Sequence, residues 1–199
     1  MHTTAETDSL LSDLSTALVR GDFGPCERLF SDKSAEKPLI RWAPDPMDLK
    51  DERLRTLLEI WIDERDRIGR LPHPDWVEPE RLLFAIGYLM VLSVVDGGRD
   101  FRYRLYGTEI SRRFMRDLTG HLVSEVPFRM SRLFFLAVYK AACIRKIPIF
   151  TEHAPPSSVN ATSWSRMILP LSTDGETVDR FLVGNIPGTW RNPDDPALV

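Results

Sequence analysis

Hydrophobic and polar residues alternate over residues 101–106, where Phe101, Tyr103 and Leu105 are separated by two arginines. A period of two is typical of a strand with one buried face and one solvent face. Gly107 follows at once and allows a tight turn in a place where a side chain would clash. The pattern therefore predicts a half-buried strand that ends at Gly107.

Four other segments have the apolar content and the flanking turn residues of strands. The apolar residues 88–95 are joined to residues 101–106 by an Asp-Gly-Gly-Arg sequence that suits a hairpin. The other three predicted strands are residues 148–153, 164–171 and 178–186. Hairpin turns join antiparallel neighbours, so we expect a five-stranded antiparallel sheet.

Helical spacing, with apolar residues three and four positions apart, marks four segments of the chain. They are residues 9–18, 49–68, 110–117 and 131–144. In the second segment Leu54, Leu57 and Trp61 fall on one stripe, and Gly120 suits the end of the third. This order of strands and helices predicts an α+β fold, with the helices packed on one face of the sheet.

The first 48 residues differ in character from the rest of the chain. Residues 31–48 are rich in proline and charge, which is typical of a linker. We expect residues 1–48 to form an N-terminal helical arm and a proline-rich linker, residues 49–190 one domain, and residues 191–199 a C-terminal tail. The helix over residues 9–18 is marginal alone, so it must pack on the domain or on a second copy, which would make a homodimer.

The composition is that of a globular chain and narrows the choice of partners. Of the 199 residues 43 % are hydrophobic, which is enough for a core. The formal net charge is −3 and the arginines are interleaved with acidic residues, which argues against a nucleic-acid-binding surface. The longest apolar run, residues 82–95, is interrupted and too short to cross a bilayer as a helix.

The two cysteines, Cys26 and Cys143, are far apart and isolated. Without a CxxC pair we expect no structural zinc, and no metal site is predicted. The N-terminus is polar and lacks the apolar segment of a secretory signal. Free thiols and the missing signal together predict a cytoplasmic protein.

Residues spread along the chain are similar to those of a known family. In order they are Trp61 and Arg65, Leu71-Pro72, Pro79, Phe101–Thr108, Asp117–Gly120, Pro148 and Leu169–Gly175. With the element order above, they resemble the PAS sensory fold, in particular a bacterial group of single-domain PAS-like proteins with a Trp-bearing helix before the sheet. The resemblance covers roughly residues 50–186. It implies a sensing or protein-interaction module that is usually without catalysis of its own.

The resemblance also implies a cavity between the sheet and the long helix over residues 131–144. The candidate ligand-binding residues are Tyr103, Leu105, Phe114, Phe135, Tyr139, Trp164 and Arg166. Alternatively, the aromatic residues among them fill a close-packed core without any ligand.

Arg166 is the candidate with the clearest chemistry. A buried guanidinium needs a partner, so Arg166 beside Trp164 suits an anionic ligand. The alternative is that Arg166 pairs with Glu152 or Asp179, or that it lies on the solvent face.

The identity of any cofactor is unknown from the sequence. Covalent flavin chemistry needs a reactive cysteine in a polar setting, whereas Cys143 lies among apolar residues of the long helix. Haem needs an axial ligand such as histidine, and no histidine lies on that helix.

No catalytic residue is predicted, because the chain has no GxSxG, HExxH, P-loop or GxGxxG motif. An enzyme of unrecognised type is the last alternative. It would require Arg166 and His153 to converge in one pocket with a perturbed carboxylate or imidazole.

Trp61 and Arg65 lie one helical turn apart and are a candidate interaction pair, because Trp and Arg are enriched in binding hot spots. Alternatively, Trp61 anchors its helix to the sheet and Arg65 stacks or pairs locally. We expect a regulatory module without an output domain of its own, which signals through an unidentified partner protein or self-association. The alternative is a ligand-free interaction scaffold.

Overall fold

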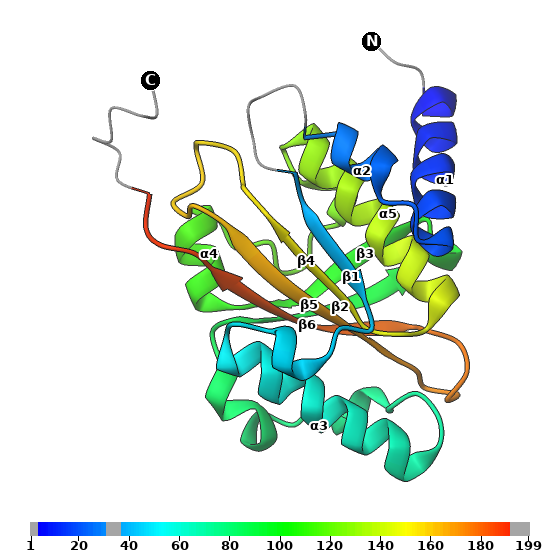
Figure 1. Cartoon of the computed structure of the whole chain (residues 1–199). Coiled ribbons are helices and arrows are strands. Elements are labelled where there is room, and N and C mark those ends of the chain that lie inside the picture. Colours follow the sequence, from blue (N-terminus) through cyan, green and yellow to red (C-terminus); the bar gives the residue numbers. More distant parts are fainter. Residues whose placement is uncertain (1–3, 31–36, 192–199) are drawn as a thin grey trace.

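The computed structural model describes residues 4–30 and 37–191, which form a six-stranded antiparallel sheet covered by helices on both faces (Figure 1). The helices are α1 (Thr4–Arg20), α2 (Gly24–Arg28), α3 (Glu52–Ile68), α4 (Thr108–Phe114) and α5 (Arg129–Arg145). The strands are β1 (Leu39–Trp42), β2 (Leu89–Val95), β3 (Asp100–Tyr106), β4 (Ile149–His153), β5 (Trp164–Leu171) and β6 (Arg180–Pro187). None of the helices among the described residues is both long and apolar enough to span a membrane.

The sheet runs in the order β1-β4-β5-β6-β2-β3, and every neighbouring pair is antiparallel. The central strands β5 and β6 are buried along nearly their whole length. Continuous burial, rather than alternation, is what a strand shows when both of its faces are covered. The two edges of the sheet are β1 and β3.

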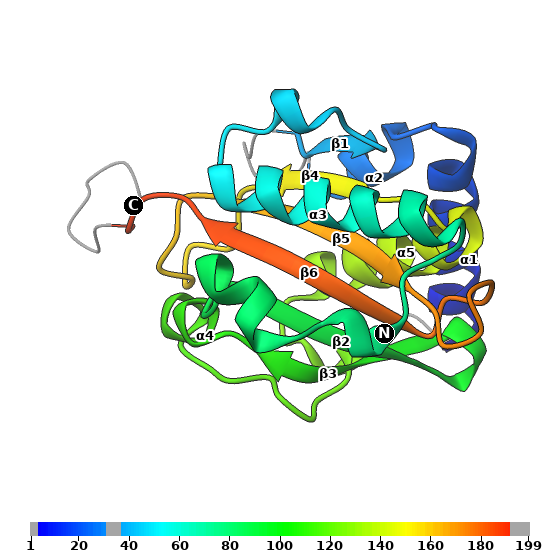
Figure 2. The ribbon, with the colours of Figure 1, turned by 90° about the horizontal axis from the view of Figure 1, so that it is seen from below.

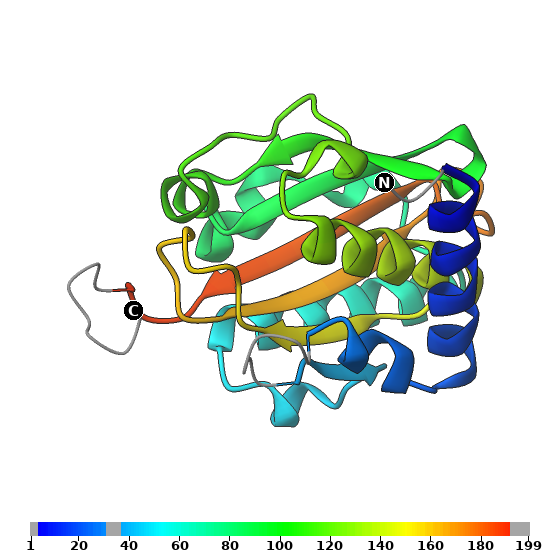
Figure 3. The same cartoon turned by 90° about the horizontal axis from the view of Figure 1, so that it is seen from above.

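The helices cover both faces of the sheet, not one face as the sequence predicts. From below, α3 lies along β5 and β6 (Figure 2), and from above, α5 crosses the opposite face with α1 beside it (Figure 3). The apolar runs of residues 167–171 and 181–183 carry the signal for this arrangement, because neither run alternates with polar residues.

All five predicted strands are present, and the sixth strand, β1, lies in the segment interpreted as a linker. Leu39 to Trp42 pair with Glu152 to Ile149 of β4. The indole Nε1 of Trp42 donates a hydrogen bond of 2.9 Å to the carbonyl oxygen of Leu18, which ties the strand to the end of α1. The linker interpretation is therefore wrong for β1. A four-residue edge strand is too short to display an alternating pattern.

The N-terminal helix α1 packs on α5 of the same chain. Its residues Leu14 and Leu18 are fully buried there. The need to cover this helix is thus met within one chain, and the homodimer remains a prediction.

Helix α3 is fixed to the sheet by a tryptophan and a glycine. The Trp61 side chain has no exposed surface, and its Nε1 donates a hydrogen bond of 3.0 Å to the carbonyl oxygen of Pro170 in β5. A Cβ atom at Gly184 of β6 would lie only 2.6 Å from Leu54 and 2.8 Å from Leu57. Glycine at this position therefore lets the helix approach the strand closely.

Substitution of Trp61 by alanine should lower the free energy of unfolding by about 3–5 kcal/mol, because it leaves a cavity and an unpaired carbonyl oxygen. Trp61→Phe keeps most of the buried area and should cost clearly less. Urea unfolding of the two variants measures the difference. Equal and small losses for both would contradict an anchoring role for Trp61.

Candidate functional site

A bulge in β3 decides which of its side chains face α5. Leu92 of β2 pairs with Tyr103, whereas the preceding Val91 pairs with Leu105, so Arg104 is an extra residue in β3. One extra residue reverses the alternation of faces. Tyr103 and Tyr106 are consequently both buried, whereas Leu105 is 46 % exposed.

The prediction that Leu105 lines the cavity is therefore wrong, because it assumed an unbroken period of two along β3. Tyr106 takes the place assigned to Leu105 and packs edge-on against Tyr103, with ring centroids 5.2 Å apart. Gly107 does permit the close turn expected of it. A Cβ atom there would collide with the carbonyl oxygens of Gly87 and Leu89.

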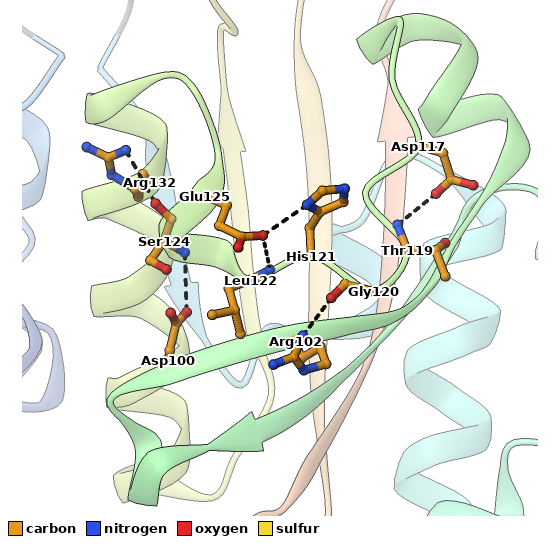
Figure 4. Close-up of polar contacts among 10 residues, drawn as sticks. All are labelled: Asp100, Arg102, Asp117, Thr119, Gly120, His121, Leu122, Ser124, Glu125 and Arg132. Carbon is orange, nitrogen blue, oxygen red and sulfur yellow. Dashed lines mark hydrogen bonds and ion pairs between the residues drawn. The ribbon is translucent and has the colours of Figure 1, made fainter.

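Residues 117–125, which we call the strap, cover part of the free edge of β3 (Figure 4). The backbone N–H of Tyr103 donates to His121 O at 3.0 Å, and the N–H of Gly120 donates to Tyr103 O at 2.7 Å. The guanidinium of Arg102 adds a bond of 2.7 Å to Gly120 O. The strap therefore closes an edge that would otherwise expose unpaired backbone groups.

Short polar contacts hold the strap in its own shape. The Glu125 carboxylate accepts the backbone N–H of Leu122 at 2.9 Å and lies 2.9 Å from His121 Nδ1, and these contacts lower the pKa of Glu125. Gly120 lies within the strap with a φ of 85°, whereas α4 ends at Phe114 and is followed by Met115 in a left-handed conformation. The expectation that Gly120 ends this helix is wrong.

A small cavity of about 30 Å³ lies between α5, the sheet, the end of α4 and the strap. Five of the candidate residues line it, namely Tyr103, Phe114, Phe135, Trp164 and Arg166. Further lining residues that the sequence reasoning missed are Tyr106, Ser131 and Asn185. Tyr139 is fully buried on α5 next to Phe135 and does not line this cavity.

Arg166 of β5 is buried, with 6 % of its surface exposed. Its Nε donates a hydrogen bond of 3.0 Å to Asn185 Oδ1 on β6, and its Cζ lies 3.7 Å above the ring of Phe135. The alternatives of a salt bridge or a solvent-facing side chain are both wrong. Glu152 accepts from Ser165 instead, and Asp179 accepts from the backbone of Thr173.

Several polar atoms near Arg166 lack hydrogen-bond partners within the described residues. Thr151 of β4, Arg166 and Asn185 are direct neighbours across three adjacent strands. The unpartnered atoms are Thr151 Oγ1, Arg166 Nη1, Asn185 Nδ2, Tyr139 Oη and His153 Nδ1. Arg166 lies close enough to Tyr139 to act on the pKa of its hydroxyl group, but the two side chains do not meet the geometry of a hydrogen bond. Unsatisfied buried groups are rare in folded proteins, so this group of atoms calls for an explanation.

The neighbours of Arg166 that titrate remain uncharged at neutral pH. Burial raises the pKa of Tyr103, Tyr106 and Tyr139, so their hydroxyl groups keep their protons. Burial and then the charge of Arg166 lower the pKa of His153 to about 3, so its imidazole is neutral. The region therefore carries one positive charge surrounded by neutral groups that can donate hydrogen bonds.

The two cysteines and the histidines that the structure describes do not line the cavity. Burial raises the pKa of Cys26 and of Cys143 to about 12, and neither residue lines the cavity. His153 packs against Phe135, with ring centroids 5.1 Å apart, and does not line it either. No cluster of three or more potential metal ligands occurs in the part of the chain that the structure describes.

The proposed interaction pair is divided between the core and the surface. Trp61 is fully buried and therefore unavailable to a partner. Arg65 lies 5.4 Å above the indole ring and forms an ion pair of 2.6 Å with Asp66. The structure thus agrees with the alternative, in which Trp61 anchors α3 and Arg65 stacks and pairs locally.

A family model described as a PAS domain matches residues 49–186, which is more than half of the chain. The chain belongs to the PAS domain family. The matched region nearly coincides with the domain expected over residues 49–190 and contains the strap, the cavity and Arg166. No curated protein and no solved structure gives a significant match. PAS domains are generally non-catalytic sensory modules and commonly mediate protein interactions.

The stability of this PAS domain should depend on pH through His153. Its pKa is about 3 in the folded protein and 6.5 in an exposed imidazole. Between these two pH values His153 is therefore protonated in the unfolded chain but not in the folded chain. Stability is then full above pH 6.5 and falls as the pH decreases through this window, by at most about 1.4 kcal/mol per pH unit.

Urea unfolding at several pH values between 7 and 5 measures this loss. The variant His153→Gln should show a flatter dependence, because glutamine does not titrate. The carboxylates whose folded pKa is lowered contribute mainly at more acidic pH. Identical slopes for wild type and variant would contradict the assignment.

Proposed function

We propose that this PAS domain is a non-catalytic regulatory module, whose input is a small ligand bound between α5 and the sheet. The observation that carries the proposal is Arg166, a buried cation that lines the cavity with an unpartnered Nη1 atom. In a core that serves stability alone, an unpaired buried charge is unfavourable, because it lowers the free energy of unfolding by several kcal/mol.

The output that we propose is contact with a signalling protein or self-association. Leu83, Phe84 and Ile86 support it, because these apolar side chains are 63, 38 and 60 % exposed within one short segment before β2. Exposed apolar segments of this kind are common at sites of protein contact. A cytoplasmic location belongs to the same proposal and is supported by the free cysteines.

Helix α5 offers a physical route from the cavity to the surface. One of its faces contributes Phe135 to the cavity, and the helix also packs against α1. A ligand that has a higher affinity for one arrangement of α5 and α1 than for another shifts the population of molecules toward that arrangement. The change in the position of α1 would then alter the surface that a partner meets.

The main alternative remains a ligand-free interaction scaffold. The small volume of the cavity, about 30 Å³, favours it, because pockets for drug-sized ligands measure about 300–1,000 Å³. The enzyme alternative has less support. His153 is perturbed as that alternative requires, but a pKa of about 3 makes it a weak base at neutral pH, and no carboxylate lines the cavity.

Native mass spectrometry of the freshly purified chain, before and after denaturation, tests the proposal. We expect a mass excess that disappears on denaturation, or a subunit number that changes with protein concentration. A bare monomer at every concentration, with a stability that does not respond to a panel of small anions and metabolites, would contradict a ligand-regulated module.

A further inference from the structure

Building on the proposed ligand-regulated function, we propose that the ligand is a small monovalent anion of halide or formate size. It would be bound by the guanidinium of Arg166 and the side-chain amide of Asn185 at the α5 face of the sheet. Both residues line the cavity and are buried, and among the described residues Arg166 Nη1 and Asn185 Nδ2 have no hydrogen-bond partner.

The charge of the cavity determines the sign of the ligand. Arg166 is the sole charged side chain among the lining residues, and none of them is acidic. The acidic residue Glu152 follows Thr151 in β4 and therefore points to the opposite face, where it lines a different pocket. An anion supplies the missing counter-charge, whereas a neutral ligand leaves a buried guanidinium uncompensated.

The donors in the cavity match the same chemistry. Asn185 already uses its Oδ1 atom to accept from Arg166 Nε, so its free Nδ2 can only donate. Tyr103 and Tyr106 also line the cavity, and burial keeps their hydroxyls protonated, which leaves both able to donate. A guanidinium and an amide with neutral hydroxyls nearby form a set of donors that suits an anion.

The volume determines the size of the ligand. A cavity of about 10–15 Å³ is large enough to hold one water molecule. The 30 Å³ found here therefore accommodates about two or three non-hydrogen atoms, which fits chloride, bromide or formate. Haem, flavin and other large ligands are far beyond it.

The contacts of Arg166 that exist do not replace an anion. The ring of Phe135 covers one face of the guanidinium at 3.7 Å, and Asn185 occupies the Nε edge. A ring face and an amide oxygen reduce the cost of burial, but neither carries a full negative charge. The guanidinium therefore has no counter-charge among the residues that line the cavity.

The test is a thermal unfolding titration of the full chain with sodium chloride and, in a separate arm, sodium formate. Sodium gluconate, which is too large for the cavity, keeps the ionic strength constant. We expect a saturable rise of the midpoint of about 2–4 °C once the anion exceeds its Kd several-fold. The arm with the lower half-saturation concentration identifies the halide or the carboxylate as the preferred ligand.

The variant Asn185→Asp supplies a built-in negative charge beside Arg166. It should melt at a higher temperature than the wild type in gluconate and should no longer respond to chloride or formate. Arg166→Met should also lose the response. Arg67→Met serves as the matched control, because Arg67 is an exposed arginine paired with Glu64, and its loss should leave the titration unchanged.

A chloride or formate response that is absent, or that is equal in wild type and Asn185→Asp, would overturn the proposal, even if Arg166→Met does not fold. Its failure is distinguishable from that of the proposed function. A neutral molecule retained in native mass spectrometry, without any anion response, would overturn the anion and leave the regulatory module in place. Hydration of Arg166 by water alone predicts no saturable response and also overturns it.

Discussion

The burial of one positive charge, the guanidinium of Arg166, is the constraint on which the interior of this PAS domain depends. Removing an arginine from water costs several kcal/mol unless its charge and its hydrogen-bond donors are matched. Here Asn185 and the face of Phe135 contact the guanidinium, and the described residues that line the cavity include no carboxylate. Burial keeps the titrating residues around Arg166 neutral, most clearly His153, whose pKa falls to about 3 through burial and then the charge of Arg166. This imbalance explains why we interpret the α5 face of the sheet as a binding site and not only as a core.

The rest of the fold positions and encloses that charge. The close fit of α3 at Gly184 and the anchor at Trp61 fix the opposite face of β5 and β6, so that the strands carrying Arg166 and Asn185 are held in register. The strap closes the cavity from the β3 side through backbone hydrogen bonds to Tyr103. Helix α5 covers the site and packs against α1, so a displacement of α5 on ligand binding would also move α1.

The sequence predicts the elements well, because residues 88–186 combine turn residues with clear apolar runs. It also identifies Arg166 and most of the aromatic lining. It fails at Leu105, since a bulge has no signature in the alternation that it interrupts. It fails at Trp61, because a tryptophan on an apolar helical stripe fits both an anchor and an exposed hot spot. Asn185 was missed because an amide acquires its role only when β5 and β6 place it opposite Arg166.

The most direct test of the central claim is anomalous diffraction from crystals of the full chain grown in sodium bromide. Bromide scatters anomalously, so its position is independent of any interpretation of ordinary solvent density. The account predicts a peak within hydrogen-bond distance of the Arg166 guanidinium and the Asn185 side-chain amide, inside the cavity between α5 and the sheet. Bromide peaks confined to the protein surface, with a carboxylate of the chain or water alone against Arg166, would contradict it.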